Sequence, residues 1–341
     1  MDLTVICPTF NEIRFVDSLV RNLCADDGTS KEVIIADGGS TDGTRRRLSE
    51  LQVIYPRLRV LDNLGRTSTK AFNLSFLSSS GKYVAFVGAH ASYNSDYFRI
   101  ALEHLDRDEC DVAGGCLKQL GENDKGSGIA LAMSSKLGVG NTEFRTRCEK
   151  KYTESVAFAV YKRSLIDRFG LMDESLPVNQ DDEFHYRIHA GGARILMIPE
   201  MSCTYYVRSN YAGLNRQYFR YGLYKPLVLK KVNGSARLRH FVPALFTLYL
   251  LSLPFAAVFI YWLIPLLAYL LIVSGRAFKF PASGRIRLFA LLAFPVLHLS
   301  YGMGFIIGFF RFRMLKSRTA EPLSDHSSPT ASGNRTNPRL F

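Results

Sequence analysis

Acidic residues are missing from a long stretch in the C-terminal half of this chain of 341 residues. Residues 201–320 contain no aspartate or glutamate, yet they carry 16 lysines and arginines around two apolar runs. A segment that is only basic and apolar suits an anionic membrane surface, where each Lys or Arg contributes about 1 kcal/mol. A nucleic-acid surface would interleave basic and aromatic residues without membrane-length apolar runs. We therefore expect an anionic membrane as a partner and no nucleic acid.

Other absences narrow the class of protein. The six cysteines stand without CxxC or CxxH spacing, which predicts neither a zinc site nor a disulfide framework and suits a reducing cytosol. The N-terminal residues MDLTVICPTFNE lack the basic and apolar regions of a secretory signal, so we expect the soluble part on the cytoplasmic side. The chain also has no P-loop, no GxGxxG fingerprint and no Ser-His-Asp arrangement.

Short β-branched runs alternate with helical patterns in the first two thirds of the chain. The alternation predicts βαβ units, and therefore an α/β fold with a Rossmann-like, mostly parallel sheet. Ligands of such sheets bind beyond the carboxyl ends of the strands, and loops 8–12, 37–44 and 88–94 each follow a strand. Strands are expected over 3–7, 32–36, 60–61, 82–87, 156–161 and 194–198, and helices over 67–78 and 181–189.

The two apolar runs predict how the chain meets a membrane. Residues 241–273 are an uncharged run of 33 residues. As one helix the run would be about 50 Å long, against a hydrocarbon core of about 30 Å. Because Pro254 stands near its middle, we expect a hairpin of two short helices; residues 288–310 are long enough for one further span. Basic residues before, between and after the runs all favour the cytoplasmic side. Either the last segment is re-entrant or this charge rule is broken once.

These patterns divide the chain into four parts. We expect a catalytic domain over 1–205, a basic interfacial segment over 206–240, a transmembrane region over 241–311 and a disordered tail over 312–341. Within the first part, residues 121–154 are rich in Gly, Ser and Lys and are interpreted as a mobile loop region. The expected location is the cytoplasmic membrane, with several spans and the catalytic domain on the cytoplasmic side.

The stretch EVIIADGGSTDGT contains the sharpest motif. A strand delivers Asp37 to its carboxyl end, where a carboxylate can accept hydrogen bonds from a uracil N3–H or from ribose hydroxyls. The alternative is a capped turn, which we favour for Asp42. In combination with TVICPTFNE, the stretch resembles family 2 glycosyltransferases of the inverting type, which have the GT-A fold. The resemblance covers about residues 3–225 and implies a UDP-sugar donor.

The resemblance also implies which residues bind the donor. In the family, the Pro-x-x-Asn-Glu loop and the first Asp of the second loop hold the uridine, and DNLGRTSTKAFNLS is similar to the family's Asn-x-Gly…Ala-x-Asn segment. Lys70 could reach phosphate or could simply be solvated. The implied donor-binding residues are Pro8, Thr9, Glu12, Asp37, Asn63, Lys70, Asn73 and Ala89.

The segment FVGAHASYNSDYF departs from the family pattern. Most relatives carry Asp-x-Asp after this strand, and its last carboxylate binds the Mg²⁺ or Mn²⁺ that bridges the donor diphosphate. This chain has Gly88-Ala89-His90 instead. A membrane-anchored subset that resembles the succinoglycan glucosyltransferase carries Asp-Ala-His-Ala. The resemblance therefore implies that His90 is the metal ligand, and its imidazole favours Mn²⁺. Alternatively, His90 only hydrogen-bonds within the loop.

The segment NQDDEFHYRI is similar to the family's Glu-Asp-x-x-Leu-x-x-Arg, with Gln180 in place of the Glu. Inverting transfer needs a carboxylate that takes the proton of the acceptor hydroxyl, and the resemblance assigns this role to Asp181. Asp182 and Glu183 are adjacent alternatives, because acidic residues also suit a helix start. Arg187 is expected to have a structural role.

The segment RQYFRYGLYK resembles the Gln-x-x-Arg-Trp motif of membrane polysaccharide synthases. The resemblance implies that Gln217, Arg220 and Tyr221 face the diphosphate and the acceptor, while Arg208 and Lys225 contact phosphate or lipid headgroups. We expect a membrane-anchored enzyme that moves a sugar from a UDP-sugar to a polyprenyl-diphosphate-linked acceptor in exopolysaccharide or surface-glycan synthesis. The alternatives are a polyprenyl-phosphate glycosyltransferase and a catalytically degenerate partner protein that binds sugar nucleotides.

Overall fold

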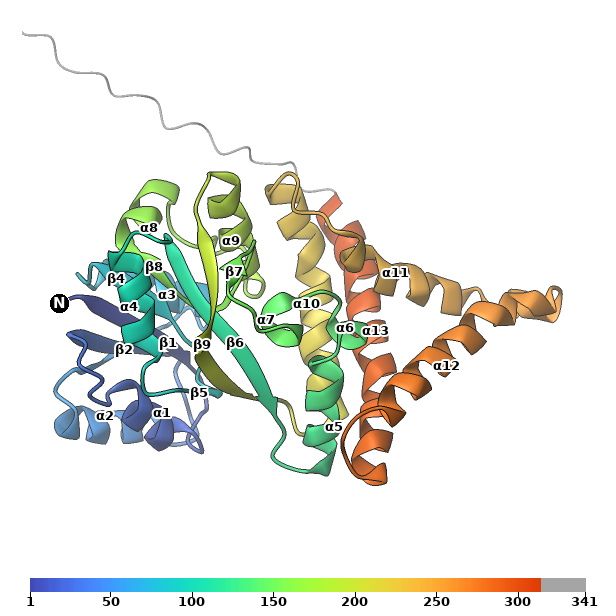
Figure 1. The fold of residues 1–341 in the computed structure, drawn as a ribbon, viewed down its shortest axis with the longest axis horizontal. Helices are drawn as coiled ribbons and strands as arrows, with labels where there is room; N and C mark the ends of the chain where they lie inside the picture. The colour runs from blue at the N-terminus through green and yellow to red at the C-terminus, as the bar shows by residue number, and fades with distance from the viewer. Residues whose placement is uncertain (314–341) are drawn as a thin grey trace, which may run out of the picture.

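The computed structural model describes residues 1–313, which form a β-sheet domain followed by a layer of long helices (Figure 1). The strands are β1 (Leu3–Thr9), β2 (Lys31–Asp37), β3 (Leu58–Asp62), β4 (Tyr83–Phe86), β5 (Ala91–Tyr93), β6 (Val112–Leu120), β7 (Lys151–Tyr152), β8 (Ala157–Lys162) and β9 (Ile195–Tyr206). The helices are α1 (Val16–Leu23), α2 (Thr44–Ile54), α3 (Ser68–Leu77), α4 (Tyr97–Asp106), α5 (Asp124–Met133), α6 (Lys136–Val139), α7 (Glu143–Thr146), α8 (Arg163–Phe169), α9 (Gln180–Ala190), α10 (Tyr211–Lys231), α11 (Leu238–Leu251), α12 (Ile264–Phe278) and α13 (Gly284–Arg313).

The sheet is mixed, with the strand order β3-β2-β1-β4-β8-β6-β9-β5 and β7 beside β9. Strands β3, β2, β1 and β4 are parallel, as the alternating pattern predicts. Strand β8 is antiparallel to β4 and to β6, while β6 and β9 are parallel. The predicted strands are all present, and the carboxyl ends of β1, β2 and β4 bring the three predicted loops to one edge.

Helices cover both faces of the sheet because successive side chains of a strand point to opposite sides. On β1, Val5 and Cys7 belong to a cluster with α1, α2 and α4, whereas Ile6 belongs to a cluster with α3, α8 and α9. Both β1 and β2 are buried almost throughout, as expected for strands that are covered on two faces. The domain therefore has three layers, with its loops free at one edge.

The expectation of a mobile loop over 121–154 is wrong, because α5, α6 and α7 lie there. The Asn123 side chain caps α5 by accepting a hydrogen bond from the Gly126 amide at 2.7 Å. A Cβ atom on Gly128 would lie 2.5 Å from Cβ of Phe289 on α13, so glycine permits the close approach of these two helices. Gly128, one of the glycines that suggested a loop, in fact serves helix packing.

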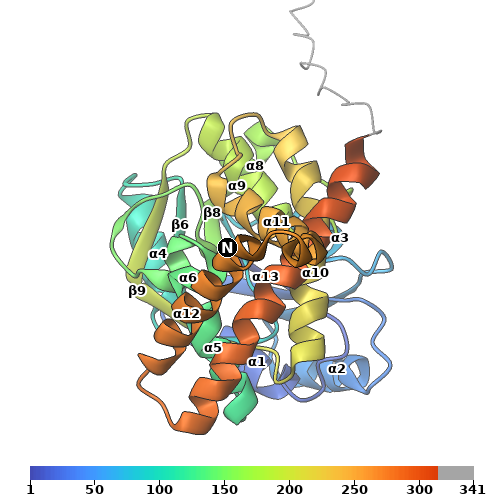
Figure 2. The ribbon, with the colours of Figure 1, turned by 90° about the vertical axis from the view of Figure 1, so that its right-hand side faces the viewer.

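A second layer, built around α10 and α13, lies beside the sheet domain (Figures 1 and 2). Small residues let the two backbones approach closely: a Cβ on Gly222 of α10 would lie 2.1 Å from the Tyr301 carbonyl oxygen. The predicted hairpin is present as α11 and α12, joined through short 3-10 turns over Leu253–Ala257 and Ile260–Leu263. Residues 312 and 313 of the predicted tail belong to α13; its remainder lies outside the described residues.

Two described helical segments, Ile260–Phe278 and Gly284–Arg313, are long and apolar enough to cross a membrane by length and composition. They differ in their surroundings, because 11% of the first apolar window is buried inside the protein, against 44% of the second. The first therefore offers its side chains to the exterior, while the second is partly a packing element.

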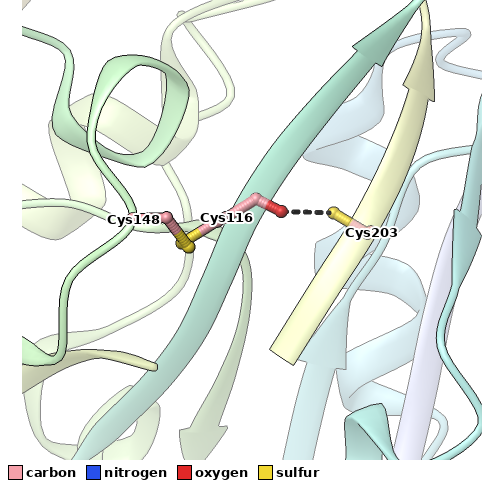
Figure 3. Close-up of a disulfide and its surroundings, with 3 residues drawn as sticks. All are labelled: Cys116, Cys148 and Cys203. Atoms are coloured by element: carbon pink, nitrogen blue, oxygen red, sulfur yellow. Dashed lines mark hydrogen bonds between the residues drawn. A yellow bond between two sulfur atoms is a disulfide. The ribbon is translucent and has the colours of Figure 1, made fainter. Parts of the chain in front are cut away.

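The prediction that the cysteines form no disulfide is wrong for one pair. Cys116 of β6 is bonded to Cys148, which follows α7 (Figure 3). The Cys203 thiol on neighbouring β9 donates a hydrogen bond to the Cys116 carbonyl oxygen at 3.5 Å. Cys116 and Cys148 are 32 residues apart, a separation that matches no short cysteine motif. Only the folding of α7 back against β6 brings their sulfur atoms together.

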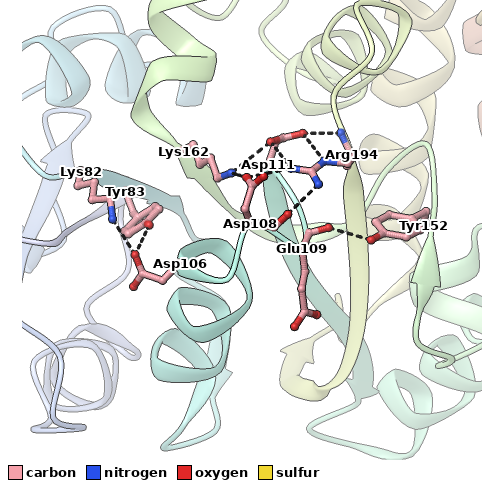
Figure 4. Close-up of polar contacts among 9 residues, drawn as sticks. All are labelled: Lys82, Tyr83, Asp106, Asp108, Glu109, Asp111, Tyr152, Lys162 and Arg194. Atoms are coloured by element: carbon pink, nitrogen blue, oxygen red, sulfur yellow. Dashed lines mark hydrogen bonds and ion pairs between the residues drawn. The ribbon is translucent and has the colours of Figure 1, made fainter.

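An ion-pair network ties together the strand ends opposite the loops (Figure 4). Arg194, which precedes β9, and Lys162, at the end of β8, both pair with Asp108 and Asp111. Burial alone would raise the pKa of Asp111, but hydrogen bonds from Arg194 and Lys162 hold it at about 2. A cavity of about 460 Å³ adjoins this network. Because the charged residues of the network pair with one another across the strand ends, we assign the network a structural role.

Candidate active site

Hydrogen bonds connect the loop after β1 to the loop after β2. The Gly38 amide donates to the Thr9 carbonyl oxygen at 2.8 Å, and the Glu12 amide donates to Oγ1 of Thr44 at 2.8 Å. The loop after β3 joins them, since a Cβ on Gly39 would lie 3.6 Å from Nη2 of Arg66. Three segments that are distant in sequence thus form one rim at the carboxyl edge of the sheet.

Asp37 lies at the centre of this rim and is 1% exposed. Its carboxylate accepts hydrogen bonds from the Gly39 and Ser40 amides, each at 3.1 Å, and from Oγ of Ser40 at 2.5 Å. These bonds build a capped turn, which the sequence had favoured for Asp42 and which is found here at Asp37 as well. Contact between Asp37 and a nucleoside stays a prediction.

The other predicted donor-binding residues divide into buried and open ones. Asn63 and Asn73 are buried and serve the fold. Nδ2 of Asn63 donates to the Thr67 carbonyl oxygen at 3.0 Å, and Asn73 donates through Nδ2 to the Met172 carbonyl oxygen and accepts through Oδ1 from the Met172 amide. Thr9 and Ala89 are also buried. Pro8 and Glu12 are half-buried and Lys70 is exposed, so these three side chains remain accessible to a ligand.

His90 is paired with Glu12 rather than standing alone. Its Nε2 atom lies 2.8 Å from Oε1 of Glu12 and 3.5 Å from Nη1 of Arg208. Among residues 1–313, no group of three or more His, Cys, Asp and Glu side chains could hold a metal ion. A metal at this position would therefore have at most two protein ligands, His90 and Glu12. The partners of His90 thus lie outside its own loop, and its role as a metal ligand stays a prediction.

The place of the family's missing first carboxylate is taken by an aromatic ring. A Cβ on Gly88 would lie 2.8 Å from Cε1 of Phe158, so any larger residue would displace the ring. Phe158 has a φ of 46°, a backbone conformation that is uncommon for a residue other than glycine. Packing therefore couples this loop glycine to Phe158 on β8.

Strand β9 connects the His90 loop to α10. Ala91 pairs with Tyr205 across β5 and β9, and the Tyr206 amide donates to the His90 carbonyl oxygen at 3.0 Å. On α10, Nε2 of Gln217 lies 3.3 Å from the Tyr205 hydroxyl and 3.0 Å from the Tyr221 hydroxyl. The structure thus brings two of the predicted acceptor residues, Gln217 and Tyr221, towards the loops; the third, Arg220, is exposed.

Arg145 is a cation of this site that sequence reasoning missed. It lies on α7, inside the segment interpreted as a loop, and no spacing pattern marks it. Its Nη1 atom is buried and has no hydrogen-bond partner among residues 1–313. Burial would lower its pKa, but the facing Tyr218, Tyr221, Tyr205 and Asp181 raise it. A guanidinium that stays charged and has an unpaired donor can bind an anion.

Asp181 stands at the start of α9, and its two acidic neighbours are engaged elsewhere. Lys225 of α10 pairs with Oδ2 of Asp182 at 2.5 Å, and Arg187 pairs with Oε1 of Glu183 at 2.8 Å. Arg187 is thus structural, as expected. Lys225 is 5% exposed and paired with Asp182; its predicted contact with phosphate or lipid headgroups stays a prediction. Of these three acidic residues of α9, only Asp181 is without an ion-pair partner among residues 1–313.

The environment makes Asp181 more basic than an ordinary aspartate. Desolvation by the surrounding protein, followed by the charge of Asp182, raises the pKa of Asp181 to about 6. For Asp182, burial alone would raise the pKa, but the Lys225 ammonium lowers it. Two adjacent carboxylates therefore differ in basicity because one has a cation and the other does not, and the free one has the higher pKa.

The three-layer mixed sheet with its loops at one edge is the fold of the GT-A glycosyltransferases. The chain belongs to glycosyl transferase family 2, whose family model matches residues 4–170. It is 31% identical to the succinoglycan biosynthesis protein ExoA of Rhizobium meliloti over 242 residues, which cover 70% of this chain and 73% of that protein. The chain is therefore an enzyme of the glycosyltransferase class.

The chain is also similar to a more distant relative in sequence and to two solved structures in fold. A dolichyl-phosphate-linked N-acetylglucosamine glucuronosyltransferase of Methanococcus voltae is 26% identical, over 67% of this chain and 74% of that protein. The mannosyltransferase PcManGT of Pyrobaculum calidifontis, solved with GDP-Man and Mn²⁺, superposes with a TM-score of 0.58 at 20% identity, covering 87% of this chain and 85% of that one. Staphylococcus aureus TarS 1–349 with UDP-GlcNAc superposes with a TM-score of 0.52 at 19% identity, covering 89% and 92%.

Proposed function

We propose that this protein is an inverting glycosyltransferase that moves a sugar from a UDP-sugar to a polyprenyl-diphosphate-linked acceptor at the cytoplasmic face of the membrane, in exopolysaccharide or surface-glycan biosynthesis. One observation carries the proposal. At the start of α9, Asp181 has a carboxylate with a raised pKa and no cation paired with it among residues 1–313, while the adjacent Asp182 and Glu183 are bound in ion pairs. Inverting transfer requires one such carboxylate as the general base that takes the proton of the acceptor hydroxyl.

In the proposed reaction, the Asp181 carboxylate takes the proton of the acceptor hydroxyl. The acceptor oxygen then forms a bond to the anomeric carbon on the face opposite the nucleotide. The bond between the anomeric carbon and the diphosphate oxygen breaks, and its electron pair leaves with UDP. The Arg145 guanidinium, with its unpaired Nη1, stabilises the negative charge that develops on the diphosphate.

Glu12 and His90 would hold the divalent metal. A carboxylate and an imidazole 2.8 Å apart fit Mn²⁺, or Mg²⁺ less well, provided that diphosphate oxygens and water complete the coordination. A bound metal would neutralise charge on the leaving diphosphate. Arg208, which lies 3.5 Å from His90, adds a fixed positive charge beside the same position.

The relatives support the substrate classes by their names. ExoA is a succinoglycan biosynthesis protein, and the Methanococcus relative acts on a sugar linked to a dolichyl phosphate. TarS was solved with UDP-GlcNAc, whereas PcManGT was solved with GDP-Man. Among these neighbours the nucleotide therefore differs, and the test has to compare uridine with guanosine donors.

The test measures nucleotide release by the full chain in vesicles. UDP-sugars and GDP-sugars are each supplied with a polyprenyl-diphosphate-linked sugar, with polyprenyl phosphate, or with no acceptor. The proposal expects UDP release that requires the diphosphate-linked acceptor, a product of inverted anomeric configuration, and loss of both with Asp181→Asn. Transfer to polyprenyl phosphate alone would favour the carrier-charging alternative. Binding of sugar nucleotide without any transfer would indicate a degenerate partner protein.

A further inference from the structure

The α11–α12 hairpin projects from the rest of the protein, and most of its apolar side chains are exposed. It projects from the α10–α13 layer on the side away from the sheet, across the direction of α13 (Figures 1 and 2). Large apolar side chains are exposed along both arms and at the apex. They include Leu245, Leu248, Leu251, Val258, Leu267 and Leu271. A surface of this kind on a soluble monomer would be unusual and indicates an apolar partner.

Several polar groups near the apex of the hairpin are paired within the hairpin. The Tyr249 hydroxyl donates to the Trp262 carbonyl oxygen at 2.7 Å and accepts from the Leu266 amide at 3.1 Å. The Trp262 indole donates to Oγ of Ser252 at 2.9 Å. In hydrocarbon an unpaired backbone group costs several kcal/mol, so a turn that enters lipid has to pair its own polar groups. An apex that faces water has no such requirement.

The apex of the hairpin is too apolar to lie among the headgroups on the far side of a bilayer. With its 3-10 turn, the second arm is the 19-residue segment Ile260–Phe278. At 1.5 Å per residue it measures roughly 29 Å, close to a hydrocarbon core of about 30 Å, so the composition of the apex and not the length of the arm decides how the hairpin lies. Residues 252–263, which form the apex, contain no charged side chain. The apex therefore suits the bilayer interior better than the opposite headgroups.

Helix α13 is tied to the catalytic domain through its first half and to α10 at its end, which argues against its crossing the bilayer. Near its start, Phe289 packs on Gly128 of α5; in its middle, the His298 ring lies 2.8 Å from the Leu137 carbonyl oxygen; near its end, Lys230 of α10 donates to the Phe312 carbonyl oxygen at 3.2 Å. If α13 spanned the membrane, α10 would lie at membrane depth beside it. The cations of α10 would enter with it: Arg216, Arg220, Lys225, Lys230 and Lys231.

We propose that the α11–α12 hairpin is a re-entrant anchor that enters a single leaflet of an anionic bilayer, while α10 and α13 lie along its surface. This inference rests on the membrane attachment in the proposed function and replaces the prediction of several spans. This arrangement places the start of α11, the end of α12 and both ends of α13 on the same side of the membrane. The basic residues at these positions then all face anionic headgroups, as the charge pattern requires: Arg237, Arg239, Arg276, Lys279, Arg311 and Arg313.

The chain carries its own depth probe, because Trp262, near the apex, is its only tryptophan. The full chain is bound to vesicles of phosphatidylglycerol and phosphatidylethanolamine whose acyl chains carry bromine at different depths. The proposal expects the strongest quenching of Trp262 by bromine near the bilayer centre, and binding at least about tenfold weaker to vesicles without anionic lipid. Unquenched tryptophan would overturn it. A doubled mass in solution would then indicate that a second copy covers the hairpin.

Cysteine labelling separates a re-entrant hairpin from a spanning one. Val258 at the apex and Val53 on α2 are 83% and 85% exposed in the protein, so Val258→Cys and Val53→Cys are matched variants, both made with Cys24→Ser. An impermeant maleimide added outside sealed vesicles should label Val53→Cys only, and the same reagent trapped in the lumen should label neither. Labelling of Val258→Cys from the lumen would refute the single-leaflet anchor.

Nucleotide-sugar turnover, measured on the same vesicles, keeps the two proposals apart. Turnover with unquenched Trp262 would refute the anchor and leave the enzymatic proposal standing. Deep quenching without transfer to any acceptor would support the anchor and refute the enzymatic proposal.

Discussion

Asp181→Asn removes the proton acceptor from the start of α9 while preserving the size and hydrogen-bonding capacity of the side chain. A positioned general base contributes roughly 10²–10⁴-fold to such a reaction, so we expect kcat to fall by at least about 10²-fold. A hundredfold loss corresponds to about 2.7 kcal/mol of transition-state stabilisation. UDP affinity, measured by calorimetry, should stay within about twofold, because no predicted donor contact is removed.

The pH profile gives a readout that a structural role of Asp181 would not produce. Burial and the neighbouring Asp182 raise the pKa of Asp181 to about 6. Because the base must be ionised, kcat/KM should be full above this pH and fall about tenfold per unit below it. The Lys225 ammonium opposes the rise. Replacing it in Lys225→Met should therefore move the acid limb to higher pH, whereas Lys225→Arg should not.

A matched control lies on the same turn of the helix. Glu183 pairs with Arg187 and faces away from the reaction, so Glu183→Gln should leave the acid limb in place. Near-wild-type turnover of Asp181→Asn would refute the assignment and point to Asp182. An unchanged pH profile in a folded Lys225→Met would refute the electrostatic reasoning; circular dichroism verifies folding, since this variant leaves Asp182 without its cation.

Three further predictions concern the loops around this base. Arg145→Ala should lower kcat by roughly 10-fold or more, with Arg145→Lys intermediate, because the diphosphate loses a charged donor; equal kcat in all three proteins would contradict this role. Gly88→Asp should destabilise the protein by about 1–3 kcal/mol in urea unfolding, and Phe158→Ala should relieve that cost in the double variant; additive effects would exclude their contact. His90→Ala should weaken the dependence of turnover on Mn²⁺, while His90→Asp should shift the preference towards Mg²⁺; an unchanged metal titration in both would remove His90 from the metal site.

Features that depend on neighbours in sequence could be predicted. Strand β2 and the turn at Asp37 follow from a β-branched run and from glycines next to a short acidic side chain, and each hydrogen bond of that turn joins residues within three positions. The hairpin near Pro254 also follows from local composition. In contrast, the glycines of 121–154 misled, because their role in α5 depends on contact with α13, more than 150 residues later.

The sequence alone determined the class of enzyme, the loop-bearing edge of the sheet, the acidic start of α9 and the basic, apolar character of the C-terminal half. Only the tertiary structure decided which carboxylate is free, because the cation that occupies Asp182 comes from α10, 43 residues away. It also decided that Arg145 faces the site, that Cys116 meets Cys148, and that α13 packs on the catalytic domain. The physical reason is the same in each case: local patterns set which groups a segment carries, while basicity, pairing and burial depend on which distant groups the fold places beside them.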